Sequence, residues 1–157
     1  MNAIIRETKT IKGLIRIGGS KNAALPIIAT SILTKEKVIL KNVPNISDID
    51  DLINILRKIN VTVLRHDDKL IIQREKKIKN TILMDEVKKI RGSIYLLPVI
   101  LLLRKKVLSK YPGGCNFGKR PIDYHLMAFK EMNVKIIDTE SRIKLKTKKE
   151  GDYYDRY

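Results

Sequence analysis

Hydrophobic and polar positions along the chain alternate in segments that predict short strands and amphipathic helices. The strands are expected at residues 13–17, 38–40, 61–63 and 70–72. The helices are expected from Ser20, which can cap the first, toward Leu33, and from Asp48, with Ser47 as the cap, to Ile59. A strand, helix, strand and helix followed by a two-stranded hairpin predict an α/β unit whose helices cover one sheet face.

The same order of elements occurs twice, and this repeat organises the chain. The second copy predicts strands at residues 107–109, 134–136 and 143–145. Matching residues lie 72 or 73 positions apart, and the pairs are Asn60 with Asn133, Asp50 with Asp123, and Pro26 with Pro98. The two Asn residues follow helices, at the place where a left-handed residue usually ends a helix. Agreement in element order, turn and register indicates two βαβαββ units.

Two glycine-containing turns carry residues that suit an anion. The segment 18–22 is a strand-to-helix turn with Lys21 and Asn22 at the start of the helix. Exposed backbone N–H groups, the helix dipole and a lysine together suit phosphate, although glycine turns before helices are also common structural features. Arg91 occupies the equivalent turn of the second copy and offers a bidentate fork for phosphate.

An elaborated loop at residues 111–121 distinguishes the second copy from the first. Cys115 lies among its glycines, with Arg120 close in sequence. Nearby cations lower the pKa of a thiol and make it a better acid or nucleophile, whereas an incidental loop cysteine is the alternative. Asp123, at the start of the next helix, is either an acceptor for a sugar or uracil or a plain helix cap.

The composition narrows the class of protein. The 157 residues are 43% apolar but only 5% aromatic, and the net charge of +16 comes from lysines scattered through nearly every segment. This pattern favours a solvated basic surface, with a cleft for small phosphorylated substrates, over nucleic-acid binding. His66 and His125 are too few and too far apart to predict a metal site. The apolar run 94–103 is too short to cross a bilayer, so we expect a cytoplasmic protein without membrane contact.

The motifs at these positions resemble the enolpyruvyl transferases that act on UDP-N-acetylglucosamine. The matching segments run in order at residues 19–26, 42–44, 90–93, 112–115 and 118–125. The last two are similar to the catalytic loop of that family, which the sister family acting on shikimate 3-phosphate lacks.

The resemblance implies an α/β (α+β) fold in which repeated βαβαββ units, of the inverse α/β barrel type, form two domains with the substrates between them. It implies transfer of the enolpyruvyl group of phosphoenolpyruvate to the 3-hydroxyl of UDP-N-acetylglucosamine, with release of phosphate. In this family that reaction is the first committed step of peptidoglycan synthesis. It proceeds by addition and elimination through a tetrahedral intermediate, and we expect neither a cofactor nor a metal ion.

The resemblance also implies the roles of individual residues. Cys115 is the general acid that protonates the phosphoenolpyruvate methylene; it can form a covalent adduct and is the thiol expected to be alkylated by fosfomycin. The residues expected to bind phosphoenolpyruvate are Lys21, Asn22 and Arg120. The residues expected to bind UDP-N-acetylglucosamine are Arg91, Arg120, Pro121, Ile122, Asp123 and Tyr124.

The length of the family sets the expected domain organisation. We expect the first unit at residues 1–75, the second, with the cysteine loop, at 76–149, and a truncated tail at 150–157. The second domain of the family, which supplies a catalytic Asp, is expected to be absent, and a second chain that supplies it is one expected partner. Two alternatives stay open: a module that binds the UDP-sugar without turnover, and a basic nucleic-acid-binding α/β protein.

Overall fold

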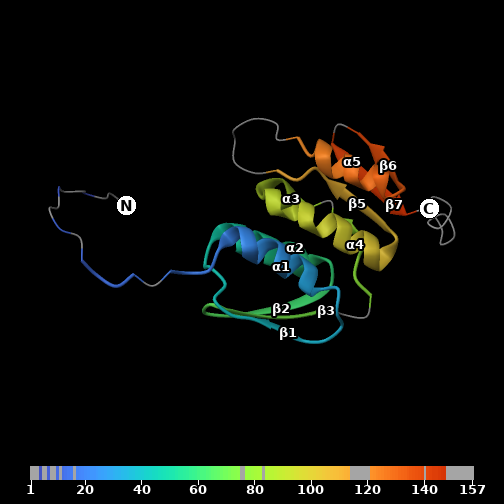
Figure 1. Cartoon of the computed structure of the whole chain (residues 1–157). Coiled ribbons are helices and arrows are strands. Elements are labelled where there is room, and N and C mark those ends of the chain that lie inside the picture. The colour runs from blue at the N-terminus through green and yellow to red at the C-terminus, as the bar shows by residue number, and fades with distance from the viewer. Residues whose placement is uncertain are drawn as a thin grey trace, which may run out of the picture.

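The computed structural model describes residues 4, 7, 10, 12–15, 17–74, 77–82, 84–113, 121–139 and 141–147. The first part contains α1 (Lys21–Ser31), β1 (Val38–Leu40), α2 (Ser47–Lys58), β2 (Val61–His66) and β3 (Lys69–Arg74) (Figure 1). The second part contains β4 (Thr81–Ile82), α3 (Glu86–Lys89), the 3-10 helix η1 (Arg91–Tyr95), α4 (Leu96–Arg104), β5 (Lys106–Lys110), α5 (Asp123–Glu131), β6 (Val134–Asp138) and β7 (Arg142–Thr147).

The strands form two sheets with matching connectivity. The first sheet has the order β1-β3-β2 and is antiparallel throughout. The second has the order β4-β5-β7-β6, in which β5-β7-β6 is antiparallel and β4 adds to β5 in parallel. The predicted α/β fold is therefore confirmed, and the predicted hairpins pair at both places where the sequence repeats. The unit boundaries at residues 75 and 149 fall outside the described residues and stay predictions.

The strand predicted at residues 13–17 is wrong for the described part of that segment. These residues carry no strand, and Leu14 is 100% exposed. A strand needs partners for its backbone N–H and C=O groups. In the described structure β1 pairs with β3 alone, whereas β5 also has β4 at its side, and the described residues at 12–15 lie away from the helices (Figure 1).

The helix ends follow the sequence prediction except at α2. The Ser20 hydroxyl accepts a hydrogen bond from the Ala23 amide at 3.4 Å, as expected of a cap. Ser47, predicted to cap the second helix, is instead its first helical residue and makes no capping bond. The Ile46 carbonyl already accepts a hydrogen bond from the Ile49 amide at 3.0 Å. The capping position is therefore Ile46, one residue earlier than predicted.

Left-handed residues close three of the helices. Asn60 and Asn133 have φ angles of 70° and 56°, which confirms the prediction for both helix ends. Lys105 closes α4 with a φ of 61°, and its amide donates to the Leu101 carbonyl at 2.7 Å. Asn adopts this left-handed conformation more readily than Lys. The backbone at Lys105 is therefore more strained than the backbone at Asn60 or Asn133.

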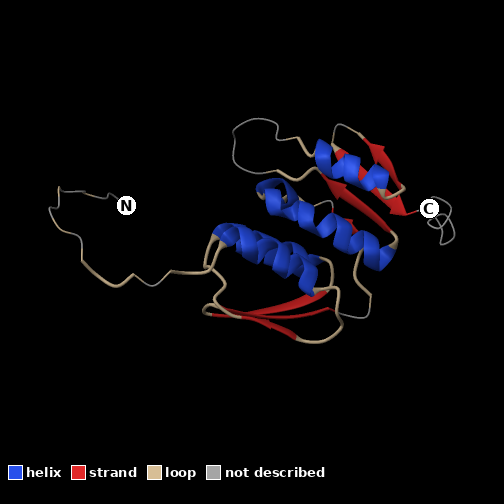
Figure 2. Cartoon of the chain, viewed as in Figure 1, coloured by secondary structure: helices blue, strands red, loops and turns tan. Residues whose placement is uncertain are grey.

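One continuous hydrophobic core joins the two parts of the chain. Its members include Ile28 of α1, Leu56 of α2 and Leu97 of α4, all of them fully buried. Figure 2 shows α1, α2 and α4 between the two sheets. This packing sets the starts of α1, α2 and η1 at the same end of the molecule. None of the helices in the described ranges is long and apolar enough to cross a bilayer.

Candidate anion pocket at the helix starts

A cavity of about 200 Å³ lies where the first turns of α1 and α2 meet η1. Its lining comes from four elements that are far apart in the sequence. The lining residues are Lys21, Asn22, Leu25, Asp48, Arg91, Gly92, Ile94, Tyr95 and His125.

Helix α1 presents a lysine and an amide to this cavity. Lys21 and Asn22 are its first two residues, at the positive end of the helix dipole. The Lys21 Nζ lies 3.1 Å from the Asp48 Oδ2, and the two side chains are 48% and 35% exposed. Water therefore reaches both groups, and an anion that enters the cavity meets the ammonium without a large rearrangement.

Arg91 reaches the cavity from the start of η1. Its Nη2 donates to the Pro121 carbonyl at 3.4 Å, which links η1 to the residues just before α5. The buried Ser93 hydroxyl hydrogen-bonds the carbonyls of Val87 and Ile90 at 3.0 and 2.9 Å, and so holds the turn that carries Arg91.

A glycine sets the distance between η1 and α1. A Cβ on Gly92 would lie 2.8 Å from the Leu25 Cδ1, closer than ordinary contacts allow. Because Gly92 and Leu25 both line the cavity, a side chain at residue 92 would push its walls apart. The Arg-Gly-Ser order thus combines a cation, a close contact and a turn-stabilising hydroxyl in three adjacent residues.

The charges of the cavity favour an anion. Lys21 and Arg91 contribute two positive charges and Asp48 one negative charge, while His125 and Tyr95 are two further ionisable groups. The backbone amides at the start of α1 add further partial positive charge. A guanidinium, an ammonium and a helix start are the groups that hold phosphate and carboxylate oxygens.

The segment that leads to the cysteine loop is anchored beside this region. The Gly113 amide donates to the Val87 carbonyl at 3.1 Å, and a Cβ on Gly113 would lie 1.5 Å from the Lys88 carbonyl oxygen. The Tyr111 hydroxyl donates to the Asp138 carboxylate. Burial and this hydrogen bond raise the pKa of Tyr111 to about 12.

The structure brings together three of the residues predicted to bind substrates, namely Lys21, Asn22 and Arg91. Cys115 and Arg120 lie outside the described residues. The other predicted residues, Pro121 to Tyr124, surround the start of α5 without lining the cavity: Ile122 is 5% exposed and Tyr124 is 85% exposed. Asp123 begins α5 without a capping hydrogen bond from its side chain. The binding roles of all these residues stay predictions.

Sequence reasoning did not assign a role to three charged or ionisable lining residues, Asp48, Tyr95 and His125. His125 lies two positions after Asp123 in the same motif, so this closeness in sequence could have marked it as a candidate site residue. Asp48 had no comparable signal, because its approach to Lys21 depends on how α1 and α2 pack.

The fold and this pocket define an α/β protein with two similarly connected sheets, with a cationic cavity at its helix starts. The family described as EPSP synthase (3-phosphoshikimate 1-carboxyvinyltransferase) matches residues 5–155. The chain belongs to this family of carboxyvinyl (enolpyruvyl) transferases.

Relatives within the family have a more specific name, UDP-N-acetylglucosamine 1-carboxyvinyltransferase. One from Thermotoga maritima is 40% identical over 133 residues, covering 85% of this chain and 32% of the relative. A second, from Listeria monocytogenes, is 37% identical over 144 residues, covering 91% of this chain and 34% of the relative. The predicted resemblance is confirmed, and the chain spans about a third of the length of these relatives.

A solved structure supports the fold independently. The enolpyruvyl transferase NikO from Streptomyces tendae superposes with a TM-score of 0.73 over 88% of this chain and 30% of that protein. The sequence identity is 18%, so this likeness confirms the fold class and carries no argument about the substrate.

Proposed function

We propose that this chain provides part of the active site for transfer of the enolpyruvyl group of phosphoenolpyruvate to the 3-hydroxyl of UDP-N-acetylglucosamine. The observation that carries the proposal is the cavity in which Lys21, Asn22 and Arg91 meet at the start of α1. The names of the relatives at 37% to 40% identity supply the substrates.

In the proposed site, Lys21 and Arg91 hold the charged oxygens of the substrates, and Asn22 hydrogen-bonds the reacting groups. Cys115 acts as the general acid that protonates the methylene carbon of phosphoenolpyruvate. The sugar oxygen then bonds to the neighbouring carbon, and its proton passes to a base. Loss of phosphate and of one methyl proton restores the double bond and releases the enolpyruvyl ether.

The remaining predicted residues surround this chemistry. Arg120 contacts both substrates, and the residues after it line the nucleotide-sugar site. The proposal includes a second chain that supplies the part of the site corresponding to the unmatched two thirds of the relatives. It also includes a cytoplasmic location, a role in peptidoglycan synthesis and alkylation of Cys115 by fosfomycin.

The first test is phosphate release from phosphoenolpyruvate and UDP-N-acetylglucosamine, by the chain alone and mixed with the remaining two thirds of the Thermotoga maritima relative. We expect release that Cys115→Ala abolishes and that Arg91→Gln lowers by about 10- to 100-fold, since a charged hydrogen bond to phosphate is lost. The matched control is Lys69→Gln, which removes one positive charge at the exposed first residue of β3 and should leave the rate unchanged.

The outcomes separate the proposal from its alternative. Binding of UDP-N-acetylglucosamine without release in either mixture would indicate the non-catalytic module instead. If a folded sample showed neither binding of UDP-N-acetylglucosamine nor release of phosphate, the proposal and its alternative would both be overturned.

A further inference from the structure

A second cavity, of about 380 Å³, lies at the opposite end of α2 from the anion pocket. Its lining residues are Asn60, Lys77, Ile78, Lys79, Asn80, Thr81 and Arg104. Asn60 lies just after Ile59, the C-terminal cap of α2, whereas Asp48 lies in the first turn of that helix. A helix of 12 residues is about 18 Å long, so the two cavities are separate sites.

The wall of this second cavity is held by backbone hydrogen bonds. The Lys79 amide donates to the Ile59 carbonyl at 3.0 Å, and the Asn80 carbonyl accepts from the Leu108 amide at 3.0 Å. These bonds tie the segment before β4 to the end of α2 on one side and to β5 on the other. In Figure 1 this segment joins the two sheets beside the end of α4. The cavity is therefore a formed feature of the fold.

Among the described residues, the lining carries three positive charges, from Lys77, Lys79 and Arg104, and no acidic residue. The ion pairs within the described residues involve other cations, such as Lys58 and Lys110. The carbonyls at the end of α4 bear a partial negative charge, but the Lys105 amide hydrogen-bonds one of them, so the three full charges dominate.

Arg104 provides a second, independent sign of a ligand. Its Nε is buried and has no hydrogen-bond partner within the described residues. A buried N–H group without an acceptor is costly, and native proteins nearly always satisfy such groups. An anion in the cavity would supply the acceptor, and a guanidinium can bind phosphate through two parallel hydrogen bonds.

We propose that this second cavity binds the phosphoryl groups of a small phosphorylated molecule. Arg104 contacts the phosphoryl oxygens through its guanidinium, and Lys77 and Lys79 supply the remaining charge. The side chains of Asn60, Asn80 and Thr81 offer neutral hydrogen bonds. The site is concave, and none of its described lining residues is an aromatic residue on which a base could stack, so a compact anion fits it better than single-stranded nucleic acid.

The test is a titration of the ¹⁵N-labelled full chain with pyrophosphate at constant ionic strength, followed by NMR. The amides of Lys79, Asn80 and Thr81 report on the second cavity, and those of Asn22 and Gly92 report on the anion pocket. We expect saturable shifts at residues 79–81. Arg104→Gln and Lys79→Gln should each raise the dissociation constant of pyrophosphate about tenfold or more, because each removes a charged contact.

The control variant is Lys69→Gln, which makes the same charge change at the distant first residue of β3 and should alter the dissociation constant less than about twofold. Lys79 is exposed, so its variant keeps the test valid if Arg104→Gln unfolds the protein. Shifts confined to the anion pocket, shifts that rise linearly without saturation, or equal effects of Lys79→Gln and Lys69→Gln would each overturn the proposal.

Discussion

Gly18 and Gly19 stand side by side before α1, but their surroundings differ. A Cβ on Gly19 would lie 1.8 Å from the Asn42 carbonyl oxygen and 3.1 Å from a carbon of Pro44. A Cβ on Gly18 would meet nothing within 4 Å. The second glycine is therefore needed for close approach of two backbones, because it lets the start of α1 lie against the loop before α2.

This difference predicts unequal effects of the same substitution. Gly19→Ala should lower the free energy of unfolding by about 1–3 kcal/mol, as overpacking commonly does. Gly18→Ala should change it by less than about 0.5 kcal/mol, as expected of an exposed site. Urea unfolding followed by circular dichroism measures both, and equal effects would contradict the assignment of the clash to Gly19.

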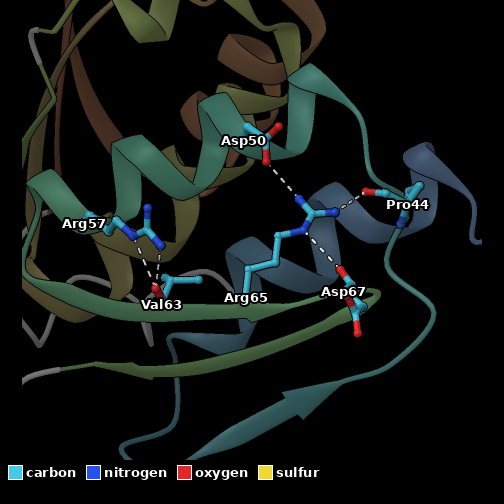
Figure 3. A network of polar contacts seen from close by, with 6 residues as sticks. All are labelled: Pro44, Asp50, Arg57, Val63, Arg65 and Asp67. Atoms are coloured by element: carbon cyan, nitrogen blue, oxygen red, sulfur yellow. Dashed lines mark hydrogen bonds and ion pairs between the residues drawn. The ribbon is translucent and has the colours of Figure 1, made fainter.

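At the scale of elements, Arg65 joins the β2–β3 hairpin to the loop and helix that carry Asp48 (Figure 3). Its Nη1 lies 2.8 Å from the Asp50 carboxylate, and its Nη2 donates to the Pro44 carbonyl at 2.9 Å. Its Nε donates to the Asp67 carbonyl at 3.3 Å, and its side chain is only 17% exposed. One planar guanidinium thus positions three segments.

Arg65→Lys keeps the charge but cannot reproduce this geometry, because an ammonium lacks the planar fork. We expect a loss of about 1–3 kcal/mol in the free energy of unfolding, since the charged hydrogen bonds to the part-buried Pro44 carbonyl and to the Asp67 carbonyl are lost. Arg142→Lys, on the exposed face of β7, is the matched control and should be close to neutral. A thermal or urea denaturation series that ranks the two variants equally would refute the role given to Arg65.

At the scale of the whole molecule, two carboxylates at α3 pair with lysines in a chain that carries a net charge of +16, and one of these pairs joins the two parts of the chain. Asp85 pairs with Lys110 of β5 at 2.6 Å, and Glu86 pairs with Lys58 of α2. The hydrogen bond and charge of Lys110 lower the pKa of Asp85. The hydrogen bond from Lys58, followed by one from the backbone, lowers the pKa of Glu86.

These shifts give a direction to the dependence of stability on pH. Both carboxylates have lower pKa values in the folded chain than their ordinary values of 3.8 and 4.5. Their contribution is therefore present above those values and is lost as pH falls through the folded pKa values. We expect the melting temperature to drop below about pH 4.5, and the double variant Asp85→Asn, Glu86→Gln to show a shallower drop.

Glu36→Gln is the control for this pH series, since Glu36 is exposed in a turn outside these pairs. Circular dichroism melts between about pH 3 and pH 7 provide the comparison. If the double variant and the control lost stability along the same curve as the original chain, the pairs at α3 would not account for the acid sensitivity.

Local signals in the sequence determined most of the elements. Alternating apolar residues were enough to predict both hairpins, and Asn60 and Asn133 correctly predicted left-handed helix ends. The motif with Lys21 and Asn22 correctly predicted the turn into α1. These features depend on neighbours a few positions away, so the physical forces that produce them are visible in a short window of sequence.

Only the tertiary structure decided which residues share a site. Asp48 and Lys21 are 27 positions apart and meet because two helices pack, a contact for which neither local segment has a signal. The segment 13–17 has the apolar pattern of a strand, yet its described residues form none, although β1 pairs with β3 alone in the described structure and leaves an edge beside it. Sequence by itself thus determined most of the elements and the family. The packing of helices and strands decided which residues line each cavity, because those contacts join distant parts of the chain.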